Sequence, residues 1–426
     1  MTAIKITPTK LNGKVKIPPS KSLAHRAIIC AALAQGKSKI SNIQYSKDIE
    51  ATIQALRALG TTINTYNDYI IVDGRTTFTK QNSRIDCLES GSTLRFMIPL
   101  SISKQNQVHF VGQGNLGKRP LATFYEIFEQ QNIKYTYSKD VLNLVIEGVL
   151  RPGDFHIPGN ISSQFITGLL FALPLLDGNS TITVTSPLES RGYIDLTLQM
   201  LELYGISIAH DNYQTFTIVG NQQYQPQEYY VEADFSQAAF YLVAGAIGND
   251  VTLLDLNLQS LQGDKQTLQI LESMGATIMI TEEGVTVKGE NLHGTTIDAS
   301  QCPDVIPVIS VACSVAEGES KIINAGRLRI KECDRIEATT SQLQVLGVNA
   351  NQTRTTIEIN GVTLLHGGKC KSYDDHRIAM MLAIAATIAD GEVIIDNQEC
   401  VQKSYPSFWD DYKRLGGNIC ECNMEK

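Results

Sequence analysis

The feature that most constrains this fold is a segment that recurs six times along the 426 residues. Each copy has the end of a helical pattern, a glycine or asparagine, a short run with alternating β-branched residues, a polar turn and usually a second such run. The glycine or asparagine recurs about every 69 to 73 residues, at Gly60, Asn132, Gly205, Gly275, Gly347 and Gly416. These residue types accept the left-handed conformation that ends many helices, and the paired runs predict β-hairpins. We therefore expect six similar units.

Between the expected hairpins lie runs that are apolar nearly all the way round a helix. They cover residues 165–176, 238–247, 305–315 and 378–388. A helix that is apolar on every face is buried on most of its surface. We therefore predict an α/β (α+β) fold of repeated mixed strand-helix units, with apolar helices inside and sheets outside.

The last of the six segments stops at Lys426, before a second hairpin strand can form. Residues 1–17 could supply that strand, because their stretch LNGKVKI has a turn followed by alternating residues. The start of the chain would then belong to the carboxy-terminal half. We predict one three-unit domain over residues 21–233 and a second over 1–20 and 234–426, with the active site in the cleft between them.

Composition argues against several classes of protein. The net charge of −8 disfavours a nucleic-acid partner or an anionic membrane, both of which bind basic surfaces. The opening residues MTAIKITPTK have no apolar stretch, and no later run reaches membrane-spanning length without a charge or a turn. We expect a cytoplasmic protein with no membrane contact, and a monomer, because no coiled-coil pattern marks a partner surface.

The stretch PPSKSLAHR at residues 18–26 places cations and hydroxyls at an expected helix start. The two prolines favour an extended approach, and Ser20 can cap the helix. Lys21, Ser22 and Arg26 then lie near backbone N–H groups at the positive end of the helix dipole. The stretch is consistent both with an ordinary capped helix and with a site for a doubly charged oxyanion such as phosphate.

Further polar clusters precede apolar runs. SGSTLR at 90–95 has a glycine that lets a ligand approach the backbone, and SSQF at 162–165 offers two hydroxyls and an amide. KRP at 118–120 adds two cations, and SRGY at 190–193 adds one more. Each of these stretches can equally be a helix cap or a surface turn.

The second half of the chain places carboxylates beside cations. Asp304, in the stretch CPD, heads an apolar run, where it can cap the helix or act as a general base in a partly dry site. KECDR at 331–335 alternates in sign, as solvated helices also do. DDHR at 374–377 puts a histidine and an arginine at a helix start, which the helix dipole disfavours and which indicates ligand contact. Lys403, in the stretch KSYP, is expected to be exposed if it has no ligand.

Taken in chain order, these clusters resemble the enolpyruvyl transferases, in particular the members that act on shikimate 3-phosphate. The matching stretches span the chain: SKSLAHR, SGSTLR, KRP, SSQF, CPD, KECDR, DDHR and KSYP. The resemblance implies a two-domain inverse α/β barrel with three similar units per domain. It also implies transfer of the enolpyruvyl group of phosphoenolpyruvate to the 5-hydroxyl of shikimate 3-phosphate, with release of phosphate and no metal or organic cofactor. That reaction belongs to the shikimate pathway of aromatic amino acid biosynthesis.

The resemblance further assigns roles to individual residues. Those implied to bind shikimate 3-phosphate are Lys21, Ser22, Arg26, Ser162, Ser163, Gln164, Ser190, Tyr193, Asp304 and Lys331. Those implied to bind phosphoenolpyruvate are Lys21, Gly91, Arg119, Gln164, Arg335, Arg377 and Lys403.

The implied reaction explains why so many cations are needed. Two substrates bring two phosphates and two carboxylates together, and these repel one another unless they are paired. Addition needs a base for the 5-hydroxyl and an acid for the methylene carbon of phosphoenolpyruvate, and elimination of phosphate reverses the second proton transfer. We assign Asp304 as the base, and Glu332, Lys21 and Lys403 to proton and charge handling. Because the cations come from both halves, we expect the protein to close on both ligands before turnover.

Two other interpretations compete with this one. The relatives that transfer the same group to UDP-N-acetylglucosamine have an asparagine where Ser22 stands, and usually a reactive cysteine near the KRP stretch. This chain has no cysteine between Cys87 and Cys302. A non-catalytic anion-binding protein of this fold is expected to lose Asp304 or Glu332, and this chain keeps both.

Three positions depart from patterns seen in the family. Glu89 stands where many members have asparagine, Phe96 where some have proline, and Arg191-Gly192 where some have Lys-Pro. The first two could alter the wall behind Gly91. These departures affect the expected affinity and inhibitor response, and leave the expected reaction unchanged.

Overall fold

The structure is a computed structural model that describes residues 2–105, 107–138 and 141–423. Contacts between residues divide the chain into two compact units. We call Pro19–Glu232 the central unit, and Met1–Pro18 together with Ala233–Lys426 the terminal unit. Each unit has its own buried apolar core.

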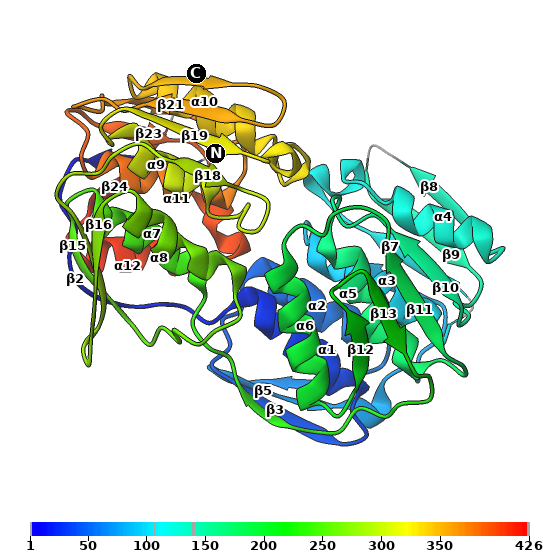
Figure 1. The fold of residues 1–426 in the computed structure, drawn as a ribbon. Coiled ribbons are helices and arrows are strands. Elements are labelled where there is room, and N and C mark those ends of the chain that lie inside the picture. Colours follow the sequence, from blue (N-terminus) through cyan, green and yellow to red (C-terminus); the bar gives the residue numbers. More distant parts are fainter. Residues whose placement is uncertain (1, 106, 139–140, 424–426) are drawn as a thin grey trace. The chain divides into compact units, whose positions relative to one another are not determined.

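Three four-stranded sheets form the outer layer of the central unit (Figure 1). The first contains, in order across the sheet, β14 (Glu228–Tyr230), β3 (Lys37–Ser41), β5 (Tyr69–Asp73) and β4 (Thr62–Thr65). The second contains β6 (Ser83–Asp86), β7 (Gln107–Val111), β9 (Asn143–Glu147) and β8 (Lys134–Ser138). The third contains β10 (Asp154–Ile157), β11 (Ser180–Val184), β13 (Thr215–Ile218) and β12 (Ile208–Asp211).

The terminal unit has three sheets of the same kind. The first contains β2 (Asn12–Lys16), β15 (Asp250–Leu254), β17 (Gly284–Gly289) and β16 (Ala276–Thr281). The second contains β18 (Thr296–Asp298), β19 (Glu319–Ile323), β21 (Ile357–Asn360) and β20 (Asn349–Gln352). The third contains β22 (Gly368–Cys370), β23 (Val393–Ile395), β1 (Thr2–Thr7) and β24 (Asn418–Asn423). In all six sheets the first pair is parallel and the other two are antiparallel.

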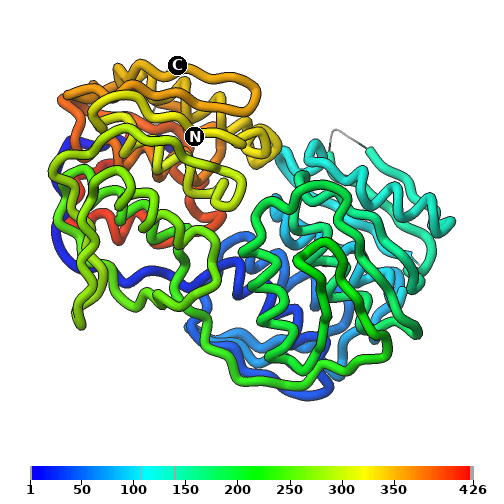
Figure 2. The backbone as a smooth tube through the Cα atoms, viewed as in Figure 1, coloured from blue at the N-terminus to red at the C-terminus, as the bar shows by residue number. Residues whose placement is uncertain are grey.

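The first strand of the chain completes the last sheet. β1 pairs with β24 and occupies the place that the second hairpin strand takes in the other five sheets. The prediction that residues 1–17 supply this strand is confirmed, but its assignment to LNGKVKI was wrong, because β2 pairs instead with β15. In β1, Ala3, Ile4 and Ile6 are buried, as a central strand requires, whereas only Val15 is buried in β2, which suits an edge. Figure 2 shows this blue segment among later segments of the terminal unit.

The six predicted left-handed residues all have positive φ angles. The values are +106° at Gly60, +55° at Asn132, +81° at Gly205, +95° at Gly275, +87° at Gly347 and +91° at Gly416. Five of them lie between an outer helix and the first strand of a hairpin, and Gly416 lies between the last helix and β24, so the sequence period does correspond to one structural unit.

Buried helices lie inside both units, as predicted. The inner helices are α1 (Lys21–Leu33), α3 (Gly91–Ile102), α5 (Ser163–Ala172), α7 (Phe235–Ala246), α9 (Ile306–Ser314) and α11 (His376–Ala386). Every residue of α7, α9 and α11 is buried, and these three helices contact one another. Their uniform burial is what an all-apolar helix surface requires.

Amphipathic helices connect these inner helices to the hairpins. They are α2 (Lys47–Ala58), α4 (Ala122–Gln130), α6 (Arg191–Leu203), α8 (Gln266–Ser273), α10 (Arg335–Val345) and α12 (Phe408–Arg414). Short 3₁₀ turns are η1 (Gly74–Thr76), η2 (Gly114–Lys118), η3 (Leu173–Leu175), η4 (Gly263–Lys265), η5 (Gly326–Ile330) and η6 (Gln398–Lys403). The predicted α/β class, with apolar helices inside and sheets outside, is confirmed.

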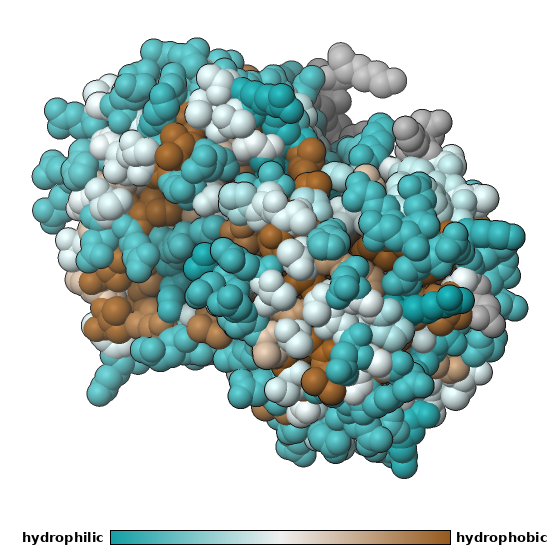
Figure 3. Space-filling model, turned by 45° about the vertical axis from the view of Figure 1, so that its right-hand side comes forward, coloured by the Kyte–Doolittle hydropathy of each residue, from teal (hydrophilic) through white to brown (hydrophobic). Residues whose placement is uncertain are grey.

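Hydrophilic side chains cover most of the face shown in Figure 3, and hydrophobic residues form separate patches on it. Within the described part of the chain, no helix combines the length and apolar character needed to cross a membrane.

Candidate active site

The predicted site residues lie mainly at the starts of helices, and they form one group in each unit. In the terminal unit, Asp304 precedes α9, Arg335 opens α10, and Arg377 lies in the first turn of α11. In the central unit, Lys21 opens α1, Gly91 opens α3, and Ser163 opens α5. Most of the predicted polar residues therefore lie at helix ends.

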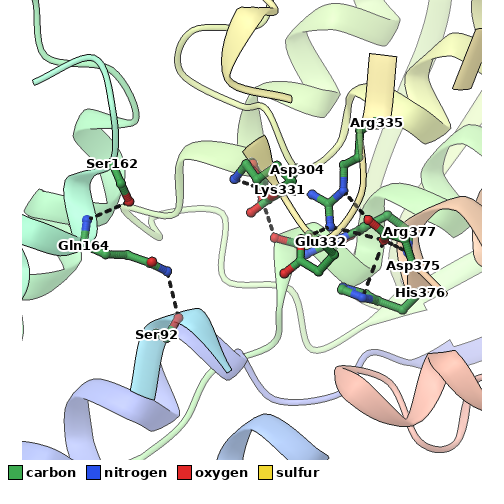
Figure 4. Close-up of polar contacts among 12 residues, drawn as sticks. Ser92, Ser162, Gln164, Asp304, Lys331, Glu332, Arg335, Asp375, His376 and Arg377 are labelled. Carbon is green, nitrogen blue, oxygen red and sulfur yellow. Dashed lines mark hydrogen bonds and ion pairs between the residues drawn. The ribbon is translucent and has the colours of Figure 1, made fainter. Parts of the chain in front are cut away.

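Arg335 is the centre of the group in the terminal unit (Figure 4). Its guanidinium donates to Asp304 Oδ1 at 2.7 Å, to Glu332 Oε2 at 2.7 Å and to Asp375 Oδ2 at 2.7 Å. The Arg335 side chain is only 1% exposed and that of Asp375 is fully buried. Burial opposes the charge of Arg335, but Asp375, Glu332 and Asp304 outweigh it and hold the pKa of Arg335 well above its usual value.

Asp304 lies between two cations. Its Oδ1 accepts from Lys331 Nζ at 3.0 Å and from Arg335. Burial favours the neutral acid, but Lys331, Arg335 and Arg377 outweigh it and hold the pKa of Asp304 well below its usual range. The alternative that Asp304 caps the following helix is excluded, because the cap position is Val305 and no side chain bonds there. Asp304 is therefore an ionised carboxylate fixed by two cations.

Arg377 is anchored by the side chain of Asp375 and by a backbone carbonyl of α7. Its own N–H donates to Asp375 Oδ1 at 2.8 Å, and Asp375 thereby caps α11. Its guanidinium donates to the carbonyl of Ser236 in α7 at 2.9 Å and lies 6.0 Å from the ring centre of Phe240. Asp375 thus binds the guanidinium of Arg335 and the backbone N–H of Arg377.

Asp264 is a further buried carboxylate near this group. It accepts a hydrogen bond from the Ser236 hydroxyl. Burial and the charge of Asp304 raise its pKa to about 6, and Arg377 opposes that rise. Lys403 lies at the end of η6 and is also buried, at 6% exposure. The expectation that Lys403 is exposed when it has no ligand was therefore wrong.

Lys21 forms an ion pair at the start of α1 in the central unit. Its Nζ lies 2.7 Å from Asp48 Oδ2 of α2, and both side chains are largely buried. Ser20 caps α1 by accepting from the Leu23 N–H at 3.4 Å, as predicted. Asp48 is not among the predicted site residues.

Arg26 is held by backbone and side-chain acceptors. Its Nε donates to Thr197 Oγ1 at 2.9 Å, and its terminal nitrogens donate to the carbonyls of Ser22 at 2.7 Å and Tyr193 at 2.9 Å. Burial lowers its pKa to about 10, and nearby Tyr193 opposes that change. Arg26 therefore joins the start of α1 to the start of α6 and is charged at neutral pH.

Arg119 lies against Gly91. A Cβ placed at Gly91 would overlap Nη1 of Arg119, so a larger residue there would displace this guanidinium. Gly91 follows Ser90, which caps α3 by accepting from the Thr93 N–H at 3.2 Å. Arg119 follows the 3₁₀ turn η2. An ordinary surface turn was one of the two alternatives that the sequence left open for this stretch.

Gln164 joins α5 to α3 (Figure 4). Its Nε2 donates to Ser92 Oγ at 2.9 Å, and its Oε1 accepts from Arg95 at 2.7 Å. Ser162 caps α5 by accepting from the Gln164 N–H at 3.3 Å. Ser162 therefore caps α5, and the amide of Gln164 is oriented by two side chains.

The other predicted residues of the central unit lie at the starts of α5 and α6. Ser163 is buried in the first turn of α5, and Ser190 is buried with a φ of +54° at the start of α6. The Tyr193 ring lies 5.9 Å from the Arg26 guanidinium carbon.

Several polar residues that orient the predicted site residues were not themselves predicted. They are Asp48, Thr52, Ser92, Arg95, Ser236, Asp264 and Asp375. Asp375 and Arg95 fall inside the quoted stretches DDHR and SGSTLR, so a rule that counts every charge at a helix start would have found them. Asp48 follows a Ser-Lys helix start and carries the same signal. The described residues contain no group of three or more His, Cys, Asp or Glu side chains placed to hold a metal ion.

Solved structures share this architecture along its full length. An EPSP synthase from Acinetobacter baumannii is 26% identical with a TM-score of 0.81, covering 99% of this chain and 100% of that one. The enolpyruvyl transferase NikO from Streptomyces tendae, at 16% identity, has a TM-score of 0.82 and covers 100% and 99% of the two chains. The fold is therefore that of an enolpyruvyl transferase.

Sequence comparison narrows this class to one family. The family model described as EPSP synthase (3-phosphoshikimate 1-carboxyvinyltransferase) matches residues 6–412. The 3-phosphoshikimate 1-carboxyvinyltransferase of Clostridium perfringens is 54% identical over 99% of this chain and 100% of its own. That of Clostridioides difficile is 52% identical over the whole of both chains. The chain belongs to the EPSP synthase family, and the resemblance inferred from its motifs is confirmed.

Proposed function

We propose that this chain transfers the enolpyruvyl group of phosphoenolpyruvate to the 5-hydroxyl of shikimate 3-phosphate and releases phosphate. Full-length membership of the EPSP synthase family supports this reaction. The observation that carries the proposal at residue level is the ion group around Arg335, where Asp304 lies between two cations. Such a group offers both a carboxylate for a hydroxyl proton and cations for anionic substrates.

The proposed ligands of shikimate 3-phosphate lie close to helix starts. They are Lys21, Ser22, Arg26, Ser162, Ser163, Gln164, Ser190, Tyr193, Asp304 and Lys331. The helix starts at α1 and α5 support a phosphate and hydroxyl site, because they combine N–H groups, hydroxyls and a lysine. Arg26 also supports this site, because its guanidinium donates to the carbonyls of both Ser22 and Tyr193.

The proposed ligands of phosphoenolpyruvate are Lys21, Gly91, Arg119, Gln164, Arg335, Arg377 and Lys403. Two features support this set. The guanidinium of Arg119 lies in contact with Gly91, which places a cation beside the amino end of α3. The guanidinium of Arg377 donates to the carbonyl of Ser236, so its charge is already oriented before any ligand binds.

Proton transfer in this proposal begins at Asp304. The carboxylate accepts the 5-hydroxyl proton while the hydroxyl oxygen bonds to C2 of phosphoenolpyruvate and C3 gains a proton. Elimination then removes one C3 proton and expels phosphate, which leaves the enolpyruvyl ether. Substrate anions that pair with Lys331 and Arg335 would weaken the pull of these cations on Asp304 and raise its pKa toward that of an effective base. Glu332, Lys21 and Lys403 are assigned to the C3 proton and to charge handling.

Phosphate release tests the proposal directly. Purified protein is incubated with phosphoenolpyruvate alone, with added shikimate 3-phosphate, and with added UDP-N-acetylglucosamine. We expect release only in the second tube. Release only with the nucleotide sugar would overturn the acceptor, and no release in any tube would overturn the reaction.

We further propose that the chain is a monomer. Its exposed large apolar residues are spread over many elements, as Tyr66, Leu203, Ile280 and Leu364 illustrate. Light scattering coupled to size-exclusion chromatography should give a mass near the 46.8 kDa of one chain. A mass of twice that value would contradict the proposal.

A further inference from the structure

A hydrogen-bonded chain of four buried side chains joins three helices of the central unit. His25 Nδ1 of α1 lies 2.8 Å from Thr52 Oγ1 of α2, which lies 2.7 Å from Thr93 Oγ1 of α3. Thr93 Oγ1 donates to Ser90 Oγ at 2.8 Å. All four side chains are at most 1% exposed. Among the described residues, Nε2 of His25 is buried and has no hydrogen-bond partner. Because burying such polar groups costs free energy, apolar residues would fill a mere packing role better.

The direction of every hydrogen bond in this chain follows from one of them. A hydroxyl has a single proton, and that of Thr93 goes to Ser90. Thr52 must therefore donate to Thr93, and His25 must donate to Thr52 from Nδ1. His25 is then the neutral tautomer with its proton on Nδ1. Burial lowers the pKa of His25 to about 3; Asp48 opposes that shift, and Lys21 and Arg26 add to it.

Ser90, at one end of this hydrogen-bonded series, caps the start of α3. Ser90 accepts from the Thr93 N–H as well as from its hydroxyl, so Thr93 holds the cap residue by two bonds. The next residue is Gly91, over which Arg119 lies, and then Ser92, which orients Gln164. All three groups proposed to bind phosphoenolpyruvate in this part of the unit thus depend on where α3 begins.

The other end fixes α1 against α2. Lys21 pairs with Asp48 and His25 with Thr52, and each pair lies one helical turn after the other on both helices. The ring of His25 also meets Phe96 of α3 edge-on, with 6.4 Å between centroids. His25 therefore also contacts α3 directly, through Phe96, which is one of the positions that depart from the family pattern.

We propose that His25, Thr52 and Thr93 are positioning residues that place the amino end of α3, and so the phosphoenolpyruvate part of the site, relative to Lys21. This inference rests on the proposed function. None of the three residues needs to touch a substrate. Their role is to hold Gly91 and Ser92 at a fixed distance from the lysine at the start of α1.

The test compares three variants by steady-state kinetics. Thr52→Val keeps the shape of the side chain and removes the hydroxyl that links His25 to Thr93. Thr52→Ser keeps a hydroxyl at this position. Thr61→Val is the matched control. Thr61 is buried in the same unit, just beyond the other end of α2, and forms a single hydroxyl contact of 2.8 Å with Thr77. We expect Thr52→Val to raise KM for phosphoenolpyruvate at least about fivefold and KM for shikimate 3-phosphate less than about twofold. Thr52→Ser and Thr61→Val should keep both values near those of the wild type.

A second measurement does not depend on turnover. The ¹⁵N and ¹H resonances of the His25 imidazole should show a neutral ring protonated at Nδ1, and Thr52→Val should shift them while Thr61→Val does not. If Thr52→Val does not fold, Thr52→Ala takes its place.

The possible failures are distinguishable. A wild type that never turns over would overturn the proposed function. A wild type that turns over, with KM for phosphoenolpyruvate unchanged in Thr52→Val, would overturn the positioning role alone. If Thr52→Val raised both KM values equally and Thr61→Val did the same, the hydrogen-bonded series would only stabilise the fold. That result would also overturn the positioning role.

Discussion

Asp304 is the residue on which the proposed chemistry most depends. Because it is an ionised carboxylate between Lys331 and Arg335, its removal takes away a proton acceptor and leaves both cations in place. Asp304→Ala should therefore still bind shikimate 3-phosphate but lower kcat at least about a hundredfold. Glu332→Ala should behave in the same way. Titration calorimetry and initial rates measure the two effects.

The control for these variants is Glu283→Ala, which removes an exposed carboxylate paired with Lys14 on the hairpin surface. Its kcat should equal that of the wild type. Near-normal turnover of Asp304→Ala would remove Asp304 from the role of base, and near-normal turnover of Glu332→Ala would remove Glu332 from proton handling.

Asp375 should matter for stability as well as for activity. It is fully buried and contacts the guanidinium of Arg335, which is 1% exposed. Asp375→Asn keeps the shape and removes the charge that offsets Arg335, so we expect a loss of about 3 kcal/mol in the free energy of unfolding. Urea unfolding measures it. Glu358→Gln, which breaks a solvated pair with Lys321, is the control and should leave the midpoint unchanged. Equal midpoints for both variants would contradict this prediction.

His25 should make the protein sensitive to acid. Its pKa is lowered to about 3 by burial, whereas in the unfolded chain it is near 6.5. The unfolded state therefore binds the proton first, so stability is lost as the pH falls below about 6.5, by up to about 1.4 kcal/mol per pH unit. His25→Gln should show a shallower loss between pH 6 and 4 in urea unfolding. Identical slopes in the two proteins would contradict the assignment of a neutral buried histidine.

At the scale of the element, the helix-ending glycines allow a matched comparison. Gly347 and Gly416 have φ angles of +87° and +91°, so alanine is strained at both. A Cβ at Gly347 would also lie 2.5 Å from the His366 ring, whereas no atom lies within 4 Å at Gly416 among the described residues. Gly416→Ala should cost about 1 kcal/mol and Gly347→Ala clearly more. Thermal unfolding measures the loss of stability in both variants. Equal losses would show that backbone strain alone accounts for the cost, and would contradict a contribution from the His366 contact.

Local signals predicted the elements well because each element is specified by its own residues. The all-apolar helices, the six left-handed residues and the hairpins follow from periodicity and turn chemistry. The exchange between β1 and β2 did not follow, because both stretches alternate and only the partner sheet distinguishes a central strand from an edge.

The site shows the same limit. The motif stretches were predicted, but the partners that orient them were not, because Asp48 and Asp375 reach Lys21 and Arg335 across 27 and 40 residues. Such pairing is a property of the packed helices. No local pattern specifies it.

At the scale of the whole molecule, two separate cores predict two separate unfolding events. The apolar cluster around α7, α9 and α11 and the one around α1, α3 and α5 share no residue. Trp409, the single tryptophan, lies in α12 of the terminal unit. Its fluorescence therefore reports on that unit, whereas far-UV circular dichroism reports on both. Urea unfolding followed by the two signals should give transitions that do not coincide.

Core variants show which transition belongs to which unit. Leu169→Ala in α5 and Leu382→Ala in α11 each remove a fully buried side chain at a cost of about 2–5 kcal/mol. Leu382→Ala should lower the urea midpoint of Trp409 fluorescence, and Leu169→Ala should shift only the part of the dichroism signal that fluorescence does not follow. Because the chain passes between the units twice, stabilisation could pass from one core to the other. An equal shift of the fluorescence midpoint by Leu169→Ala would show such coupling and contradict independent unfolding.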